Sequence, residues 1–174
     1  MKSLPHFPKS MALIGLIFLS FSADVDVKSI PDLQLKDMEG NLISTGEIST
    51  AGHPTLFCFW ATWCSPCKRE LNNYAELYED WQEETGLKLI AVSIDDSRNA
   101  DKVKPYVDGQ SWDYEVYLDV NGDFKRAMNV NNVPHTFLLD GNKKIVWQHN
   151  SYSPGDEDEL YELVKKLANG ESID

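Results

Sequence analysis

The chain has little cysteine, histidine and basic charge for its length. Of its 174 residues, three are cysteine, which is too few and too odd a number for a disulfide scaffold. Lys and Arg total 16 against 28 Asp and Glu, and this acidic balance argues against nucleic acid and anionic membrane surfaces as partners. The sequence also has no internal repeat, low-complexity tract or long linker, which predicts a single globular domain.

The N-terminal segment differs from the rest of the sequence in charge and hydropathy. Lys2 and Lys9 precede an apolar run over residues 11–21, which closes on Ser22 and Ala23. The run is shorter than the roughly 20 apolar residues of a transmembrane helix. It predicts a signal peptide over residues 1–23, with an uncleaved membrane anchor as the alternative. We therefore expect a periplasmic or otherwise extracytoplasmic protein, with its folded domain over residues 24–174.

Apolar periodicity and turn residues divide this domain into alternating strands and helices. A hairpin is predicted from residues 30–35 and 41–44, followed by strands over 55–60, 87–94, 114–118, 136–139 and 144–148. Helices are predicted over 67–84, 100–107 and 124–128, with a last helix that starts at Ser153 and stops at Asn169-Gly170. Ser97 is the predicted cap of the second helix, which Pro105 shortens or kinks. This order predicts a mixed sheet with helices on both faces.

Two of the cysteines form the motif Cys64-Ser65-Pro66-Cys67, directly after the apolar strand predicted over 55–60. The motif thus begins a helix, where unpaired N–H groups and the helix dipole favour a thiolate. Cys64, at the very start, is predicted to reach solvent and act as the nucleophile. Cys67, one turn further, is predicted to be the more buried resolving thiol. Pro66 stiffens the loop and removes an N–H group that has no helical partner.

A permanent disulfide and half of a zinc site are the structural alternatives for this pair. A structural zinc site would need two further ligands, and the chain has no second cysteine pair. Its histidines are scattered along the sequence, at His6, His53, His135 and His149. We therefore predict no metal site and assign the pair to thiol redox chemistry.

These residues together resemble a known family. The resemblance rests on the run Phe59-Trp60-Ala61-Thr62-Trp63-Cys64-Ser65-Pro66-Cys67, on the run Val133-Pro134-His135-Thr136-Phe137, and on the hairpin before the domain. Over residues 30–168 the chain resembles the thioredoxin-fold proteins, and among them the exported thiol-disulfide oxidoreductases of the TlpA/ResA type. The resemblance implies an α/β thioredoxin-like fold, with a central mixed sheet flanked by helices and an N-terminal β-hairpin extension.

The resemblance also implies roles for residues outside the motif. Pro134 is similar to the cis-proline of this fold, which leaves the backbone of Val133 free to pair with an extended partner peptide. Glu70 matches a glutamate implicated in proton transfer near the thiols; a plain acidic residue in the first turns of a helix is the alternative. With Trp63 and Pro66, Val133 and Pro134 are expected to hold the partner.

Cys58 stands where thioredoxin has a buried aspartate. The resemblance therefore leaves the carboxylate function at the thiols to Glu70 or to water. Cys58 itself is expected to be an inert core residue on a strand. His135, directly after Pro134, is at most a residue that lines the site.

The resemblance implies a thiol-disulfide oxidoreductase of the cell envelope that reduces disulfides of exported proteins, with cytochrome c maturation as one use. Its partners would be exported protein thiols and disulfides and a membrane or periplasmic thiol-disulfide electron donor. A monomer is expected, without a cofactor other than the redox-active Cys64–Cys67 disulfide. Reductant, oxidant and isomerase share this motif, so the direction of electron flow stays open.

Two other functions compete with this interpretation. A thiol peroxidase would require a single peroxidatic cysteine in a Pro-x-x-x-Thr-x-x-Cys motif, whereas aromatic residues precede Cys64. A copper-binding assembly chaperone on the same fold would use Cys64, Cys67 and a histidine, although such proteins space their cysteines more widely.

Overall fold

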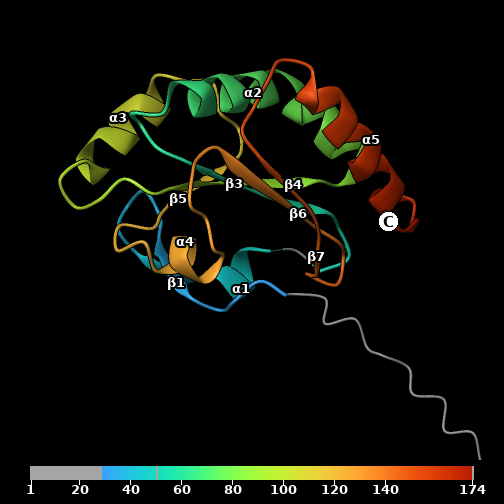
Figure 1. Cartoon of the computed structure of the whole chain (residues 1–174), viewed down its shortest axis with the longest axis horizontal. Coiled ribbons are helices and arrows are strands. Elements are labelled where there is room, and N and C mark those ends of the chain that lie inside the picture. Colours follow the sequence, from blue (N-terminus) through green and yellow to red (C-terminus); the bar gives the residue numbers. More distant parts are fainter. Residues whose placement is uncertain (1–28, 50, 174) are drawn as a thin grey trace, which may run out of the picture.

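The computed structural model describes residues 29–49 and 51–173, and within them it forms one seven-stranded sheet (Figure 1). The strands are β1 (Gln34–Lys36), β2 (Leu42–Ser44), β3 (Thr55–Trp60), β4 (Lys88–Ser93), β5 (Glu115–Leu118), β6 (His135–Leu139) and β7 (Ile145–Asn150). They lie in the order β2-β1-β5-β4-β3-β6-β7. The signal peptide predicted over residues 1–23 lies outside the described residues.

Helices cover both faces of this sheet, as predicted. The helical elements are α1 (Thr45–Ile48), α2 (Ser65–Thr85), the 3₁₀ turn η1 (Ala100–Lys102), α3 (Val103–Asp108), α4 (Asp123–Ala127) and α5 (Asp156–Ala168). Figure 1 shows α2, α3 and α5 over one face, and α1 and α4 against the other. In the described part of the chain, no helix combines the length and apolar character needed to cross a membrane.

Strand β3 lies at the centre of the molecule and is confirmed at its predicted bounds. It pairs in parallel with β4 and antiparallel with β6, and all six of its residues are buried. Because side chains alternate along a strand, Leu56, Cys58 and Trp60 enter the core beneath α2. Phe57 and Phe59 enter the second core, on the side of α4.

Helix α2 begins directly after the turn that follows β3. Its first turn tolerates Pro66 because the first N–H groups of a helix have no intrahelical partner. Gly86 ends the helix in the left-handed conformation, with φ of 69°, and donates its N–H to the carbonyl of Gln82. The face toward the sheet buries Leu71, Tyr74, Tyr78 and Trp81. The predicted helix is thus confirmed, with two residues more at its start and one more at its end.

The N-terminal hairpin is confirmed, although β1 begins four residues later than predicted. Leu35 pairs with Ile43 in the antiparallel ladder. The segment before β1 is held by a side chain instead: the Thr45 hydroxyl donates to the carbonyl of Pro31 (2.7 Å) and accepts from the N–H of Leu33 (2.9 Å). Thr45 begins α1, a single-turn helix that no sequence pattern predicted.

The predicted cap Ser97 is wrong, and the last helix begins at Asp156 and not at Ser153. The element predicted over 100–107 is η1 followed by α3, and no side chain caps the N-terminus of either. Pro105 is the third residue of α3, so its missing N–H lies in the first turn and does not kink the helix. Helix α5 is preceded by Gly155 in the left-handed conformation. The backbone N–H of Ser153 donates to the Asp156 carboxylate (2.7 Å), so the acidic residue is the acceptor at this helix start.

Phe124 of α4 closes the second core and provides a test of its packing. Its buried ring lies 5.7 Å from that of Phe57 and 5.1 Å from that of Phe59, between centroids. We expect Phe124→Ala to lower the free energy of unfolding by about 3–5 kcal/mol, measured by denaturant titration. Leu42→Ala, at a side chain that is 63% exposed, is the control and should change it by no more than about 0.5 kcal/mol. Equal losses in both variants would contradict this packing.

Candidate functional site

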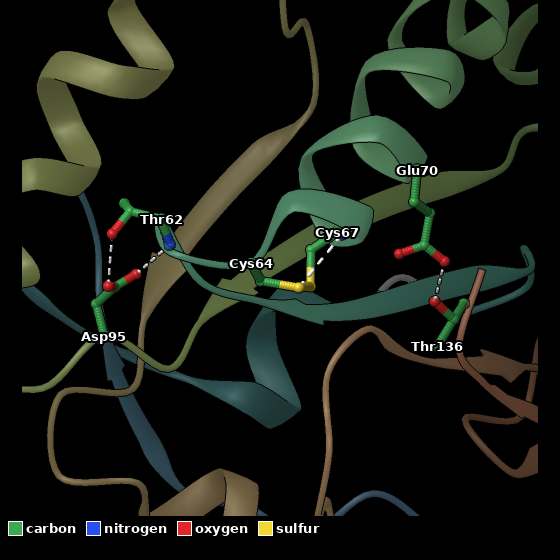
Figure 2. Close-up of a disulfide and its surroundings, with 6 residues drawn as sticks. All are labelled: Thr62, Cys64, Cys67, Glu70, Asp95 and Thr136. Carbon is green, nitrogen blue, oxygen red and sulfur yellow. Dashed lines mark hydrogen bonds between the residues drawn. A yellow bond between two sulfur atoms is a disulfide. The ribbon is translucent and has the colours of Figure 1, made fainter. Parts of the chain in front are cut away.

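A disulfide between Cys64 and Cys67 stands at the N-terminus of α2 (Figure 2). Cys64 is the N-cap residue, and its Sγ accepts the backbone N–H of Cys67 at 3.3 Å. The two Cα atoms are 5.3 Å apart, which is an ordinary separation for a disulfide. The sequence of β3 and the short turn after it therefore deliver both sulfurs to the end of a 21-residue helix, where the dipole favours negative charge.

Exposure differs sharply among the residues of this turn. The Trp63 side chain is 63% exposed, whereas Cys64 is 5% exposed and Cys67 is fully buried. The order of the two cysteines agrees with the sequence interpretation. The predicted solvent exposure of Cys64 is not observed, because in this disulfide-bonded form Cys64 is nearly as buried as Cys67. Trp63, with the exposed Ser65 and Pro66, makes the outer surface of the motif.

Glu70 lies one helical turn after Cys67 and points from α2 toward β6. Its side chain is 1% exposed. Its Oε1 accepts hydrogen bonds from the Thr136 hydroxyl (3.0 Å) and the Tyr74 hydroxyl (3.2 Å). Its Oε2 has no hydrogen-bond partner among the described residues. Figure 2 shows this second oxygen on the side of the carboxyl group that faces the disulfide.

Burial dominates the electrostatics of Glu70. Removal from water raises the pKa of its carboxyl from 4.5 to about 8, since the charged form loses its hydration. The hydrogen bonds from Thr136 and Tyr74 oppose this shift, and the negative charge of Asp156 adds to it. At neutral pH the group is mostly protonated, and it ionises in the range where thiols exchange protons.

Cys58 lies on β3 beneath this carboxyl. It is paired with Thr136 across the β3–β6 ladder, so both side chains face α2. Burial raises the pKa of the Cys58 thiol well above its usual value, and the Glu70 charge raises it further. A thiol that resists ionisation, enclosed in the core, is inert toward disulfide exchange.

The Val133–Pro134 segment precedes β6, and the peptide bond between the two residues is cis. Val133 is half-buried and packs against both cores, while Pro134 is buried. His135 faces the other side of the sheet from Thr136, stacks on Phe137 with centroids 4.3 Å apart, and lines a cavity of about 580 Å³. It is therefore a lining residue of that cavity.

Sequence reasoning missed three residues at this site. Thr136 and Tyr74 hold Glu70, and Asp95, at the end of β4, holds the turn before the cysteines. The Thr136 position could have been found from the pairing of β6 with β3, because residues opposite one another share a face. Asp95 gave a weaker signal, an acidic residue after a buried strand that neighbours the motif strand.

No group of three or more histidine, cysteine, aspartate or glutamate side chains in the described ranges is placed to hold a metal ion. The copper-binding alternative would need Cys64, Cys67 and a histidine together. His149 instead lies 3.5 Å from the Asp156 carboxylate, and His135 contacts Gln148 at 3.2 Å.

Comparison with known proteins finds similar sequences. The AhpC/TSA family model matches residues 27–148. The thiol-disulfide oxidoreductase ResA of Bacillus thuringiensis subsp. konkukian (strain 97-27) is 29% identical over 140 residues, covering 80% of this chain and 77% of that protein. The sporulation thiol-disulfide oxidoreductase A of Bacillus subtilis (strain 168) is 30% identical over 138 residues, covering 76% of this chain and 81% of that protein.

Solved structures confirm the thioredoxin-like fold. A thioredoxin-like protein from Porphyromonas gingivalis, solved in solution, is 52% identical with a TM-score of 0.72, and the match covers 80% of this chain and 92% of that one. StoA from Bacillus subtilis matches at a TM-score of 0.61 and 23% identity, over 76% of this chain and 97% of that one.

The raised pKa of Glu70 predicts a specific pH dependence of stability. Between the pKa of 4.5 in the unfolded chain and about 8 in the folded chain, the folded state binds more protons, so wild-type stability falls as pH rises through this window. Glu70→Gln cannot ionise, and its stability relative to wild type should rise by a few kcal/mol between pH 5 and pH 8, measured by denaturant titration of the disulfide form. Glu76→Gln, exposed on the same helix, is the control without such a trend. A Glu70→Gln advantage that stays constant with pH would contradict this account.

Proposed function

The chain belongs to the AhpC/TSA family as a thioredoxin-fold protein of the TlpA/ResA type, and from this membership we infer that it is an enzyme of thiol–disulfide exchange acting through Cys64 and Cys67. The observation that carries the inference is the disulfide at the N-terminus of α2, directly behind the exposed indole of Trp63. A purely structural disulfide carries no charge and is not stabilised by the helix dipole, whereas an attacking thiolate at this position is.

Exchange would proceed in two steps. The thiolate of reduced Cys64 attacks one sulfur of a target disulfide, which forms a mixed disulfide and releases the other target sulfur. Cys67 then attacks the Cys64 sulfur, which restores the Cys64–Cys67 disulfide and releases the second target sulfur. Two electrons pass to the target, and its two sulfurs take up protons to become thiols. The full burial of Cys67 supports this division, because an enclosed thiol meets the mixed disulfide and not a new target.

Glu70 would handle the protons of these steps. The carboxyl lies one turn from Cys67 and has a pKa of about 8, so it can give up a proton and regain it within one cycle near neutral pH. In its ionised form it would accept the proton that Cys67 loses when it attacks, and return it as the cycle closes. Tyr74 and Thr136 fix Oε1, which leaves Oε2 as the oxygen that carries the exchanging proton.

The target would bind across Val133 and Pro134. An extended segment can add to the backbone beside Val133 by strand pairing, while Trp63 and Pro66 offer apolar contact around the sulfur. The targets we propose are disulfides of exported proteins, with cytochrome c maturation as one use. The protein would act outside the cytoplasm as a monomer, recharged by a membrane or periplasmic thiol-disulfide electron donor.

Single cysteine variants test the two steps separately. Cys64→Ser should lose at least 100-fold in the rate of reduction of a protein disulfide such as insulin, because it lacks the attacking sulfur. Cys67→Ser should accumulate the mixed disulfide with its target, visible by mass spectrometry. Cys58→Ala, at the buried free cysteine, is the control and should keep the wild-type rate within about twofold. Wild-type turnover by Cys64→Ser would refute the assignment.

The direction of electron flow is tested by the reduction potential of the pair. For a reductant we expect a value well below about −200 mV, measured by equilibration with glutathione or dithiothreitol; a value near −120 mV would mark an oxidant. Turnover of hydrogen peroxide by the reduced protein, at a rate above its reduction of insulin, would instead support the competing peroxidase function.

A further inference from the structure

Asp95 lies at the carboxyl end of β4 and binds the turn that leads to the cysteines (Figure 2). One carboxylate oxygen accepts the backbone N–H of Thr62 (2.8 Å) and the hydroxyl of Ser93 (2.8 Å). The other accepts the hydroxyl of Thr62 (2.7 Å). Three donors from β4 and from the β3–α2 turn therefore converge on a side chain that is 1% exposed.

Asp95 is held by hydrogen bonds from neutral donors and not by ion pairs. Hydrogen bonds from N–H and O–H donors to a carboxylate are among the stronger hydrogen bonds in proteins. Among the described residues, no lysine, arginine or histidine forms an ion pair with Asp95, in contrast to the neighbouring Asp96, which pairs with Arg98 at 2.8 Å. Neutral donors alone thus hold the side chain of Asp95, in a nearly fully buried position.

Asp95 is linked to the nucleophile through the turn that it holds. Thr62 is two residues before Cys64, so the backbone between them spans no more than about 7 Å. The Cys64 N–H donates to the carbonyl of Ala61 (3.0 Å), which closes the turn between them. The nearest cation in the sequence, Lys68, extends its ammonium over the ring of Tyr106 at 5.4 Å. Glu70, the other acid near the pair, is mostly protonated at neutral pH.

We propose that Asp95 is a positioning residue for exchange, which fixes the turn from Thr62 to Cys64 and places a negative charge at the base of the turn that carries the dithiol. The proposal rests on the proposed redox function of Cys64 and Cys67. Reduction of the pair consumes two electrons and two protons and gives one thiol and, once Cys64 ionises, one thiolate. A fixed negative charge disfavours that thiolate but leaves the neutral disulfide unaffected. Asp95 therefore lowers the reduction potential of the Cys64–Cys67 pair. This effect opposes that of the helix dipole, which stabilises the thiolate.

The test is the redox equilibrium with glutathione at pH 8. Asp95→Asn keeps the shape and most hydrogen bonds of the side chain but removes the charge. We expect it to raise the equilibrium constant for reduction of the pair roughly three- to tenfold, where tenfold corresponds to about 30 mV for a two-electron couple. Asp96→Asn, which removes the same charge one residue away on the exposed side, is the matched control and should stay within about twofold of wild type.

A second variant tests the positioning itself. Thr62→Val keeps the carboxylate and its bond to the Thr62 N–H but loses the hydroxyl bond. It should slow reduction of insulin at least threefold, while its equilibrium constant with glutathione stays within about twofold of wild type. If Asp95→Asn does not fold, this variant decides, and a wild-type rate overturns the proposal.

Two further outcomes distinguish a failure of the proposed role of Asp95 from a failure of the proposed redox function. If the wild-type pair exchanges with glutathione and a folded Asp95→Asn has the wild-type constant, or Asp96→Asn shifts it equally, the inference fails alone. If the wild-type pair does not exchange at all, the proposed function fails, and the inference with it.

Discussion

Burial of β3 on both faces is the constraint on which the site depends. The strand pairs with β4 on one side and β6 on the other, and its alternating side chains serve two cores at once. Such a strand has almost no freedom to shift its register, because a slip by one residue would exchange the two faces. Its end is therefore fixed in space, and Cys64, four residues beyond it, begins α2 at a defined point.

The acid of this site enters the core from the helix and not from the strand. Cys58 occupies the strand position with a neutral thiol, and Glu70 reaches down from α2 to meet Thr136 on β6. Because Cys58 supplies a neutral thiol, the desolvation cost of ionisation at these two positions falls on Glu70 alone. Burial is the main cause of the raised pKa of Glu70, while the hydrogen bonds from Thr136 and Tyr74 lower this pKa. A protonated carboxyl and a protonated thiol can thus coexist in an otherwise apolar core.

Sequence alone predicted the parts with a long or unbroken pattern. The apolar run of β3 and the three- and four-residue spacing in α2 are decided by local burial, so both elements were predicted nearly to the residue. Four-residue α1 has no period to detect, and the start of β1 depends on Thr45, twelve residues from Leu33. Asp95 was missed because its partner Thr62 lies 33 residues away, a contact that only the parallel β3–β4 pairing creates.

The four-residue segment from Val133 to Thr136 contains both the proposed partner-binding residues and the residue that holds Glu70. Its first two residues are joined by a cis peptide bond, and its last residue donates a hydrogen bond to the carboxyl of Glu70. The two halves adjoin at the start of β6, where His135 and Thr136 pair with Phe59 and Cys58 of β3. Under the proposed function, a substitution that displaces β6 would therefore alter partner recognition and proton transfer together. Under that function, a new partner preference at Val133 would have to arise without moving Thr136, three residues later.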